Sequence, residues 1–439
     1  MAEEIRMSSI PRCQSLLKGL STSFPWPRLI LPGPTTCPLP SYKRVRTFSG
    51  ARSILLTEQM SNADKQQNAW QQPGAAAYDF RSDTITTPSA PMLTAIENTS
   101  LFDDVFREDP TTNDLESFIA RIASHEAALL VLSGTAGNQI SLRCHLTQPP
   151  HSVLCDHRAH IMNCEAGGVA SLSGAMVTGV TPSNGLYLTL EDVRDNCVLG
   201  DDIHCAPTKV IALENTLSGT IMPLSEIRRI SEFAHKHDIK LHLDGARLWE
   251  VAAAGAGSIS ELCNYFDSVS LCFSKGLGAP MGSMIVGSER FIKRARWIRK
   301  SLGGGMRMSG IIAAAARVAV DDVFGHGPYG EGGKLKKTHV RARDIAEMWQ
   351  AKGGQVKFPV ETNMVILDLS AAGISGQELV DTAQAHGLKM LEGGRLVIHY
   401  QICDDAIRRL ERVMEYLMRE RPPKVPKEAA DHVVSFRYG

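Results

Sequence analysis

Two stretches of the chain decide its fold class: IKLHLDGAR at residues 239–247 and SVSLCFSKGLG at residues 268–278. Each begins with a short apolar run and ends in a chemically active residue, Asp244 in the first and Lys275 in the second. Short apolar runs between helical patterns predict the buried strands of a wound α/β sheet. Such sheets bind ligands at the carboxyl ends of their strands, which is where both residues fall.

The same pattern recurs along the chain and predicts one large, mostly parallel sheet of seven strands. The predicted strands are 128–132, 152–155, 175–180, 208–213, 239–243, 268–273 and 282–286. The predicted helices are 113–124, 136–146, 225–238, 288–300 and 309–324, the third with Ser225 as its N-cap.

Composition divides the chain into four segments. We predict a leader and linker at 1–76, a large domain at 77–325, a small α+β domain at 326–420 and a polar tail at 421–439. The glycine-rich break GHGPYGEGG at 325–333 is the predicted hinge between the two domains. Within the small domain we expect helices at 335–351, 376–386 and 404–419 and strands at 355–360, 363–369 and 395–399.

The overall charge argues for small-molecule chemistry. The 439 residues include 47 Lys and Arg against 47 Asp and Glu, which disfavours a nucleic-acid or membrane-surface protein that binds through bulk charge. No apolar run approaches the roughly 20 residues of a spanning helix. The ten cysteines form no CxxC pair and indicate reduced thiols of an intracellular protein, with no metal site.

The leader carries its own charge. Residues 1–57 contain eight basic residues and only two acidic ones, which leaves 39 basic and 45 acidic residues for the rest of the chain. This composition is similar to that of a mitochondrial transit peptide, with RVRTFS at 44–49 suited to processing. The alternative is a disordered extension bypassed by translation from Met60. The expected location is therefore cytoplasmic or mitochondrial.

Asp244 and Lys275 together suit pyridoxal phosphate. Taken alone, Asp244 could form a salt bridge with Arg247 at a helix start. A partly desolvated lysine at a strand end, however, can form a Schiff base, and a carboxylate on the neighbouring strand keeps a pyridine nitrogen protonated. A phosphate cradle is expected in SGTAGN at 133–138, where a strand runs into a helix N-terminus.

Eight motifs in order resemble the threonine aldolase family of fold-type-I pyridoxal-phosphate enzymes over about residues 77–420. They are DFRSDT (79–84), DDVFREDPT (103–111), SGTAGN (133–138), AHI with EAGG (159–168), LENT (213–216), HLDGARL (242–248), SKGLGAP (274–280) and RKSLGGGMR (299–307). The resemblance implies a seven-stranded large domain, a smaller C-terminal domain, and cleavage of L-threonine, L-allo-threonine and related β-hydroxy-α-amino acids to glycine and an aldehyde.

The resemblance also implies roles for matching residues. Lys275 would hold the cofactor as a Schiff base, and Asp244 would pair with its ring nitrogen. Gly134 and Thr135 would bind its phosphate. His160 would stack on the cofactor ring, near the substrate hydroxyl. Arg247 would bind the cofactor oxygen or the substrate carboxylate, and Ser82 and Arg395 would bind that carboxylate. Lys300 and Arg307 would reach the cofactor phosphate of a neighbouring subunit. The protein would thus be a homodimer or homotetramer with shared active sites.

Two positions depart from many bacterial relatives. Leu217 stands where they have a histidine after LENT, and Phe106 where they have a tyrosine. Both changes remove a polar group from the substrate's side-chain end, so the preferred aldehyde and the threo or allo preference stay open. Two other functions also stay open: an alanine racemase on the same scaffold, and a non-catalytic homologue that binds the cofactor.

Overall fold

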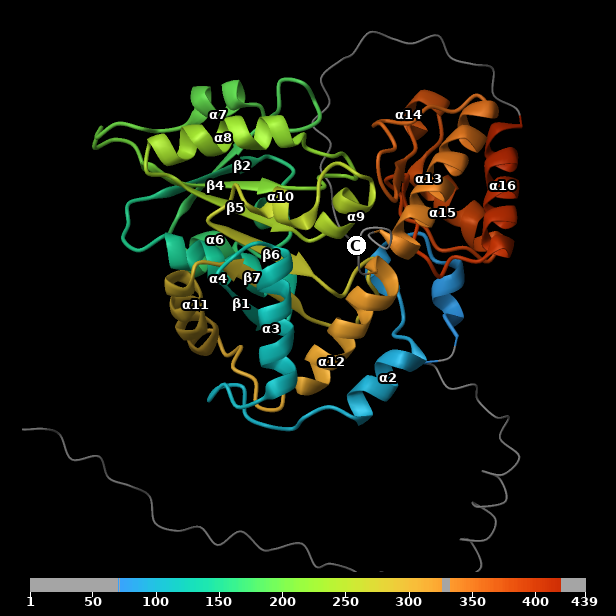
Figure 1. Cartoon of the computed structure of the whole chain (residues 1–439). Helices are drawn as coiled ribbons and strands as arrows, with labels where there is room; N and C mark the ends of the chain where they lie inside the picture. Colours follow the sequence, from blue (N-terminus) through green and yellow to red (C-terminus); the bar gives the residue numbers. More distant parts are fainter. Residues whose placement is uncertain (1–69, 71, 326–331, 420–439) are drawn as a thin grey trace, which may run out of the picture. The chain divides into compact units, whose positions relative to one another are not determined.

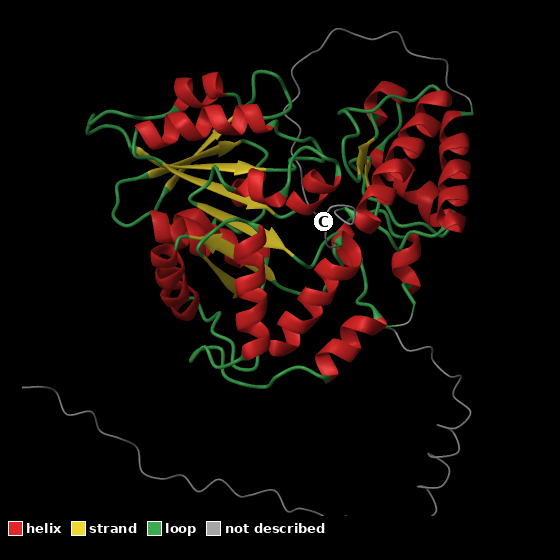
Figure 2. Ribbon diagram, viewed as in Figure 1, coloured by secondary structure: helices red, strands yellow, loops and turns green. Residues whose placement is uncertain are grey.

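The computed structural model describes residues 70, 72–325 and 332–419, which belong to one compact unit. Its centre is a seven-stranded sheet in the order β1-β7-β6-β5-β4-β2-β3 (Figure 2). The strands are β1 (Ala127–Val131), β2 (Ser152–Asp156), β3 (Met176–Val180), β4 (Thr208–Glu214), β5 (Lys240–Gly245), β6 (Ser268–Cys272) and β7 (Ser283–Gly287). Only β7 runs antiparallel to its neighbours, β1 and β6. The predicted α/β class with a mostly parallel sheet is confirmed.

Helices cover both faces of this sheet (Figure 1). They are α2 (Ala90–Glu97), α3 (Pro110–Ile122), α4 (Gly134–His145), α5 (His160–Asn163), α6 (Gly168–Ser173), α7 (Leu190–Asn196), α8 (Leu224–Lys236), α9 (Leu248–Ala253), α10 (Ile259–Cys263), α11 (Glu289–Ser301) and α12 (Gly310–Ala319), with short turns η1 (Gly74–Tyr78), η2 (Asp83–Ile85) and η3 (Val320–Phe324). The five predicted helices are present. The predicted N-cap is wrong: Pro223 occupies that position, so α8 begins one residue earlier and Ser225 lies inside it.

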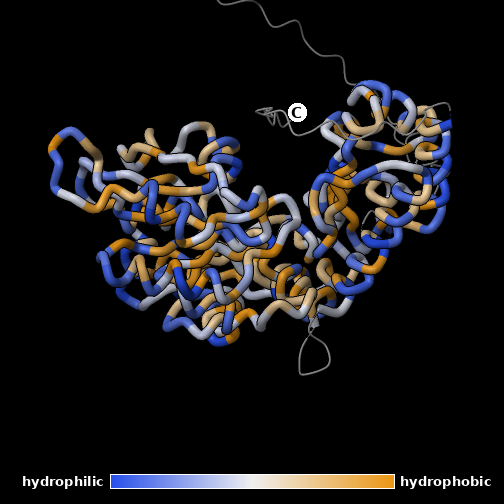
Figure 3. The backbone as a smooth tube through the Cα atoms, turned by 90° about the horizontal axis from the view of Figure 1, so that it is seen from above, coloured by the Kyte–Doolittle hydropathy of each residue, from blue (hydrophilic) through white to orange (hydrophobic). Residues whose placement is uncertain are grey.

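Alternation along the strands separates two apolar layers. In β1, Leu130 packs in the cluster that contains Ile227 of α8, whereas Leu129 packs in the one that contains Ile140 of α4. This alternation is what a strand buried on both faces requires, because successive side chains point to opposite sides. In Figure 3 the hydrophobic stretches gather inside the molecule and the outer turns are hydrophilic.

The same alternation sets the direction of the site residue on β5. Leu241 and Leu243 belong to the apolar cluster on the α8 side. His242 and Asp244 therefore point toward the opposite face, where α4 lies, and both are buried. A buried polar strip thus runs beneath α4.

The C-terminal part has a core of its own. A two-stranded antiparallel sheet, β8 (Met364–Ile366) and β9 (Arg395–Val397), packs with α13 (Gly333–Ala351), α14 (Leu369–Ala372), α15 (Gly376–Ala385) and α16 (Asp404–Met418). Phe80, from the start of the described chain, is fully buried in this core. The predicted division into two domains stays a prediction, and residues 326–331 of the predicted hinge lie outside the described residues.

The three helices predicted here are present, but one predicted strand is wrong. Residues 355–360 form no strand, because only Val356 makes a single bridge, to Leu367. The strands predicted at 363–369 and 395–399 shorten to β8 and β9. Within the described part of the chain, no helix is long and apolar enough to cross a membrane.

Helix α4 approaches the sheet closely because glycines face it. A Cβ on Gly134 would lie 2.7 Å from Cys272 Sγ, and one on Gly137 would overlap Ser270 Oγ. Both neighbours are buried residues of β6, so little room exists for relaxation. The two glycines therefore fix the distance between α4 and the strand that leads to Lys275.

We predict that Gly137→Ala destabilises the protein by about 1–3 kcal/mol, because the clash with Ser270 outweighs the gain in helix propensity. Urea unfolding of the purified variant measures this loss. Gly393→Ala is the control, since nothing lies within 4 Å of a Cβ there, and it should change stability by less than about 0.5 kcal/mol. Equal stability of the two variants would show that α4 is not held at a fixed distance.

Candidate active site

Asp244 is the residue before the last in β5 and is 6% exposed. Its Oδ2 accepts a hydrogen bond from Asn138 Nδ2 at 2.7 Å, and its Oδ1 accepts one from the Ala246 backbone N–H at 3.0 Å. A buried carboxylate is stable in its charged form when several donors point at it. This group can therefore face a positively charged ring nitrogen.

Lys275 follows β6, the strand beside β5 in the sheet. Its carbonyl oxygen accepts hydrogen bonds from Thr86 Oγ1 at 3.1 Å and from the Gly278 backbone N–H at 2.9 Å. A Cβ on Gly276 would overlap Glu250 Oε1, so any larger residue after the lysine would have to displace the buried Glu250 carboxylate. The turn that carries the half-buried Lys275 is thus held from both sides.

His160 and Glu165 complete a polar cluster around Asp244. His160 Nδ1 lies 2.7 Å from Glu165 Oε1, and the donor and acceptor atoms of all three residues lie within 4.8 Å of one another. The hydrogen bond to the Glu165 carboxylate raises the pKa of His160, although partial burial opposes it. Glu165 also accepts from Asn138 Nδ2 at 2.9 Å and Gln139 Nε2 at 2.5 Å. These N–H donors give the buried carboxylates hydrogen-bond partners.

Glu214 ends β4 on the other side of Asp244 and was not predicted as a site residue, although it lies in the LENT motif. Its Oε2 accepts the His160 backbone N–H at 2.9 Å. Burial, together with the nearby Asp244 charge, raises the pKa of Glu214 to about 7. This carboxyl group can therefore hold or release a proton near neutral pH.

The predicted phosphate cradle lies at the N-terminus of α4. Ser133 caps the helix, with its Oγ accepting the Ala136 backbone N–H at 3.1 Å. Gly134 and Thr135 are the first two helical residues, and the packing of Gly134 on Cys272 places them beside the strand end that leads to Lys275. Free backbone N–H groups at a helix N-terminus favour an anion.

The three residues predicted to bind a carboxylate gather around residues 81–83. Arg247 donates from Nε and Nη2 to the two carboxylate oxygens of Asp83, at 2.9 and 2.6 Å. Arg395 Nη2 donates to the Arg81 carbonyl at 3.2 Å, and Ser82 Oγ accepts the Thr84 backbone N–H at 3.2 Å. The structure brings these residues together, and their contact with substrate stays a prediction.

The partner of Arg247, Asp83, was not predicted as a site residue. Burial alone would raise its pKa, but the charge and hydrogen bonds of Arg247, with a smaller contribution from Lys275, hold the pKa of Asp83 at about 2. Asp83 is fully buried. It therefore orients the Arg247 guanidinium while remaining charged.

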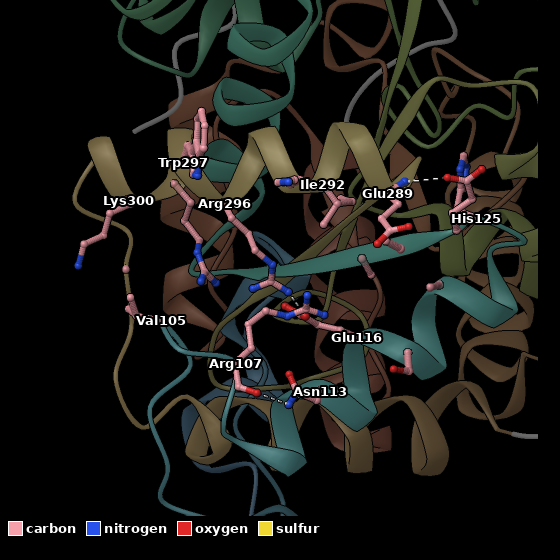
Figure 4. A pocket seen from close by; sticks show the side chains of 18 of the residues that line it. Val105, Arg107, Asn113, Glu116, His125, Glu289, Ile292, Arg296, Trp297 and Lys300 are labelled. Atoms are coloured by element: carbon pink, nitrogen blue, oxygen red, sulfur yellow. Dashed lines mark hydrogen bonds and ion pairs between the residues drawn. The ribbon is translucent and has the colours of Figure 1, made fainter. Parts of the chain in front are cut away.

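Lys300 and Arg307 are both exposed and lie apart from this cluster. Lys300 lines a cavity of about 920 Å³ between α3, β1 and α11 (Figure 4). Arg307 Nη1 donates to Asp103 Oδ2 at 2.7 Å. Lys275, Asp244 and His160 do not line that cavity. The roles of Lys300 and Arg307 toward a neighbouring subunit stay predictions.

The two departures noted in the sequence occupy different environments. Leu217 is buried and lines a small cavity with Glu214, close to the polar cluster. Phe106 is 69% exposed on the surface of the chain. Only the first of the two therefore lies beside the candidate active site of this chain.

Comparisons with known proteins identify the family of this chain. The family model of the beta-eliminating lyases matches residues 79–372. The chain is 54% identical over 360 residues to aldolase vrtJ of Penicillium aethiopicum, covering 82% of this chain and 91% of that protein. It is 48% identical over 332 residues to a low-specificity L-threonine aldolase of Candida albicans, covering 75% and 87%.

The chain is also similar to a racemase in sequence and to a solved aldolase structure in fold. The chain is 44% identical over 356 residues to alanine racemase TOXG of Cochliobolus carbonum, covering 81% of this chain and 91% of that protein. The fold matches the crystal structure of a putative L-allo-threonine aldolase from Listeria monocytogenes with a TM-score of 0.64 at 22% identity, covering 80% and 98%. The chain belongs to the beta-eliminating lyase family, among relatives that include the low-specificity L-threonine aldolases.

We predict that Asp83→Asn destabilises the protein by about 3 kcal/mol, because the largely buried Arg247 loses the carboxylate that it binds with two hydrogen bonds. In the wild type the pKa of Asp83 is lowered from 3.8 to about 2. The stabilisation is therefore complete above pH 4 and is lost as the pH falls through 2. That loss amounts to about 2 kcal/mol.

Urea unfolding between pH 5 and pH 2 measures both effects. The wild type should lose more stability over this range than Asp83→Asn, so the two curves converge in acid. Asp201→Asn, at an exposed loop position, is the control and should leave the pH dependence nearly unchanged. Parallel curves for the wild type and Asp83→Asn would contradict the assignment.

Proposed function

We propose that this protein is a pyridoxal-phosphate-dependent lyase that cleaves L-threonine and related β-hydroxy-α-amino acids to glycine and an aldehyde. The observation that carries the proposal is the pair formed by Asp244 and Lys275 at the carboxyl ends of adjacent parallel strands, β5 and β6. The names of its relatives, among them several low-specificity L-threonine aldolases, support the same reaction.

The residues present fit the cofactor. Asp244 offers a buried carboxylate for the ring nitrogen, Lys275 an amine for the aldehyde, and Gly134 and Thr135 backbone N–H groups for the phosphate. Replacing Gly134 would push a side chain against Cys272, so the cradle accepts only a residue without Cβ. When bound, the cofactor would act as a sink for the electrons released from the Cα–Cβ bond.

Ser82, Arg247 and Arg395 would bind the substrate carboxylate. A planar guanidinium suits this task because it can donate two parallel hydrogen bonds. Asp83 limits the rotation of Arg247 through its own bidentate contact. Fixing the carboxylate orients the bond to be cleaved, which is the largest positioning contribution these residues can make.

His160 would exchange the proton of the substrate hydroxyl. Its Nδ1 is engaged by Glu165, so Nε2 is the nitrogen that can face the substrate. Because Glu165 raises the pKa of His160, the unprotonated form needed to accept a proton increases only toward higher pH. Leu217 supplies no alternative proton acceptor.

A second candidate is an alanine racemase, favoured by the TOXG relative and by the apolar Leu217 beside Glu214. A racemase must exchange the Cα proton on both ring faces, whereas an aldolase must take a proton from the β-hydroxyl. The two activities therefore give different products from different substrates. A homologue without activity would give neither product.

A second copy of the chain would complete the site. Large apolar side chains are exposed near Lys300 and Arg307: Trp297 (66%) and Met308 (57%) on the same segments, and Phe106 (69%) beside Asp103, the partner of Arg307. Trp297 and Lys300 both project from α11 (Figure 4). Exposed apolar side chains gathered with cations suit an interface between copies, so we place the phosphate contacts of Lys300 and Arg307 there, in a homodimer or homotetramer.

The location of the protein depends on the leader. Residues 1–69 lie outside the described residues, and their excess of basic residues supports mitochondrial import. Translation from Met60 would instead give a cytoplasmic form without that segment.

We predict that the purified protein with pyridoxal phosphate forms glycine and acetaldehyde from L-threonine and no D-alanine from L-alanine. Lys275→Ala should lose at least about a thousandfold in kcat/KM, because the amine that anchors the cofactor is gone. Lys236→Ala, at an exposed position on α8, is the control and should retain full activity. D-alanine without acetaldehyde would establish the racemase instead.

We also predict that kcat/KM for L-threonine rises with pH as His160 loses its proton. Glu165→Gln removes the carboxylate that raises the pKa of His160, so the rising limb should move to lower pH. Glu232→Gln, at an exposed site on α8, is the matched control and should leave the profile in place. A rising limb that stays fixed in Glu165→Gln would exclude His160 as the titrating group.

A further inference from the structure

A buried polar strip runs across β5 and β6 beneath α4. His242 and Ser268 are opposite each other in register, and both are completely buried. Their neighbours Leu241, Leu243 and Val269 pack on the other face of the sheet. Most buried polar groups in such a place have hydrogen-bond partners.

Five hydrogen bonds connect this strip to the active site. His145 Nε2 lies 2.8 Å from Ser268 Oγ, which lies 2.8 Å from His242 Nδ1. His242 Nε2 lies 3.1 Å from Asn138 Oδ1. Asn138 Nδ2 then reaches Asp244 Oδ2 at 2.7 Å and Glu165 Oε1 at 2.9 Å.

The chemistry of the groups fixes the direction of every bond. Carboxylates only accept, so the Asn138 amide must present its Nδ2 to Asp244 and Glu165 and its Oδ1 to His242. His242 must therefore carry its proton on Nε2. Since burial lowers the pKa of His242 to about 4, the ring is neutral and Nδ1 is an acceptor.

The donors and acceptors of the two bonds made by Ser268 follow from the neutral His242 ring. Ser268 donates its hydroxyl proton to His242 Nδ1, so its oxygen accepts from His145 Nε2–H. Burial lowers the pKa of His145 to about 3, so this imidazole is neutral too. All four donors point toward the carboxylates, and aligned hydrogen bonds strengthen one another in a low-dielectric interior.

We infer that His242, Ser268 and His145 are positioning residues for the active site: they hold the Asn138 amide in the one orientation that directs both of its N–H groups at the carboxylates of Asp244 and Glu165. This inference deepens the proposed function and rests on the role given there to Asp244. It adds three residues outside the cluster around Asp244.

His145, the residue of this hydrogen-bond series farthest from Asp244, is also fixed in place. The His145 ring stacks on Phe291 of α11, with centroids 4.8 Å apart and an angle of 19° between the planes. The charged groups nearest that end are Asp267 and Lys240, which pair with each other at 3.0 Å. The positioning chain thus spans from α11, through α4 and two strands, to the cofactor side of the sheet.

The first test needs neither cofactor nor substrate. Selective 15N labelling of the 14 histidines in the apoprotein reports protonation and tautomer by NMR, with His242 and His145 assigned by loss of their signals in His242→Gln and His145→Gln. We expect both rings to be neutral with the proton on Nε2 between pH 6 and pH 8. A proton on Nδ1 of His242, or a charged ring, would overturn the inference.

The second test measures the equilibrium dissociation constant of pyridoxal phosphate. His242→Leu leaves Asn138 Oδ1 without a donor and should weaken binding roughly tenfold or more, while His242→Gln keeps a donor and should weaken it less than about threefold. Equal effects of the two variants would contradict the inference. Failure of His242→Leu to fold would leave the tautomer measurement to decide.

A matched pair of serine variants separates this role from simple core packing. Ser268→Ala interrupts the series of hydrogen bonds between His145 and His242. Ser231→Ala removes a similarly buried hydroxyl outside that series, which donates to the Tyr265 carbonyl at 2.7 Å and lies 3.3 Å from His235 Nδ1. We expect Ser268→Ala alone to weaken cofactor binding. If both serine variants bind the cofactor as the wild type does, Ser268 has no positioning role, even if the aldolase activity itself is present.

Discussion

The burial of the Asp244 carboxylate at the end of β5 is the constraint on which the rest of the site depends. A charge in that position requires hydrogen-bond donors, and the main side-chain donor, Asn138, comes from α4. Helix α4 can deliver it only because Gly134 and Gly137 allow the helix to lie against β6. The same approach sets the helix N-terminus beside the turn that carries Lys275. One close contact thus places the three groups that a bound cofactor would need.

The carboxyl groups around the site have different roles because their surroundings differ. Asp83 is held charged by a bidentate arginine, with a pKa of about 2, whereas Glu214 shares its surroundings with Asp244 and has a pKa of about 7. One therefore acts as a fixed counter-charge for Arg247, and the other can change its protonation near neutrality. Glu165 accepts hydrogen bonds from three side chains, Asn138, Gln139 and His160, and so orients His160.

The sequence predicted what depends on local pattern. All seven strands follow from apolar runs, and Asp244 and Lys275 follow from residue type at strand ends. Asn138 could not be assigned a partner, because it lies 106 residues from Asp244 and meets it only through the packing of α4. Asp83 was missed for the same reason, since its arginine is 164 residues away. The strand predicted at 355–360 failed because an apolar run forms a strand only where a neighbour pairs with it.

We propose that Lys275 holds the cofactor opposite Asp244. Borohydride reduction of the protein loaded with pyridoxal phosphate links the two covalently, and mass spectrometry of the digested protein locates the linkage. We expect one stoichiometric modification on the peptide that contains Lys275, and none in Lys275→Ala. Modification of another lysine such as Lys300, or no modification at all, would show that Lys275 does not hold the cofactor.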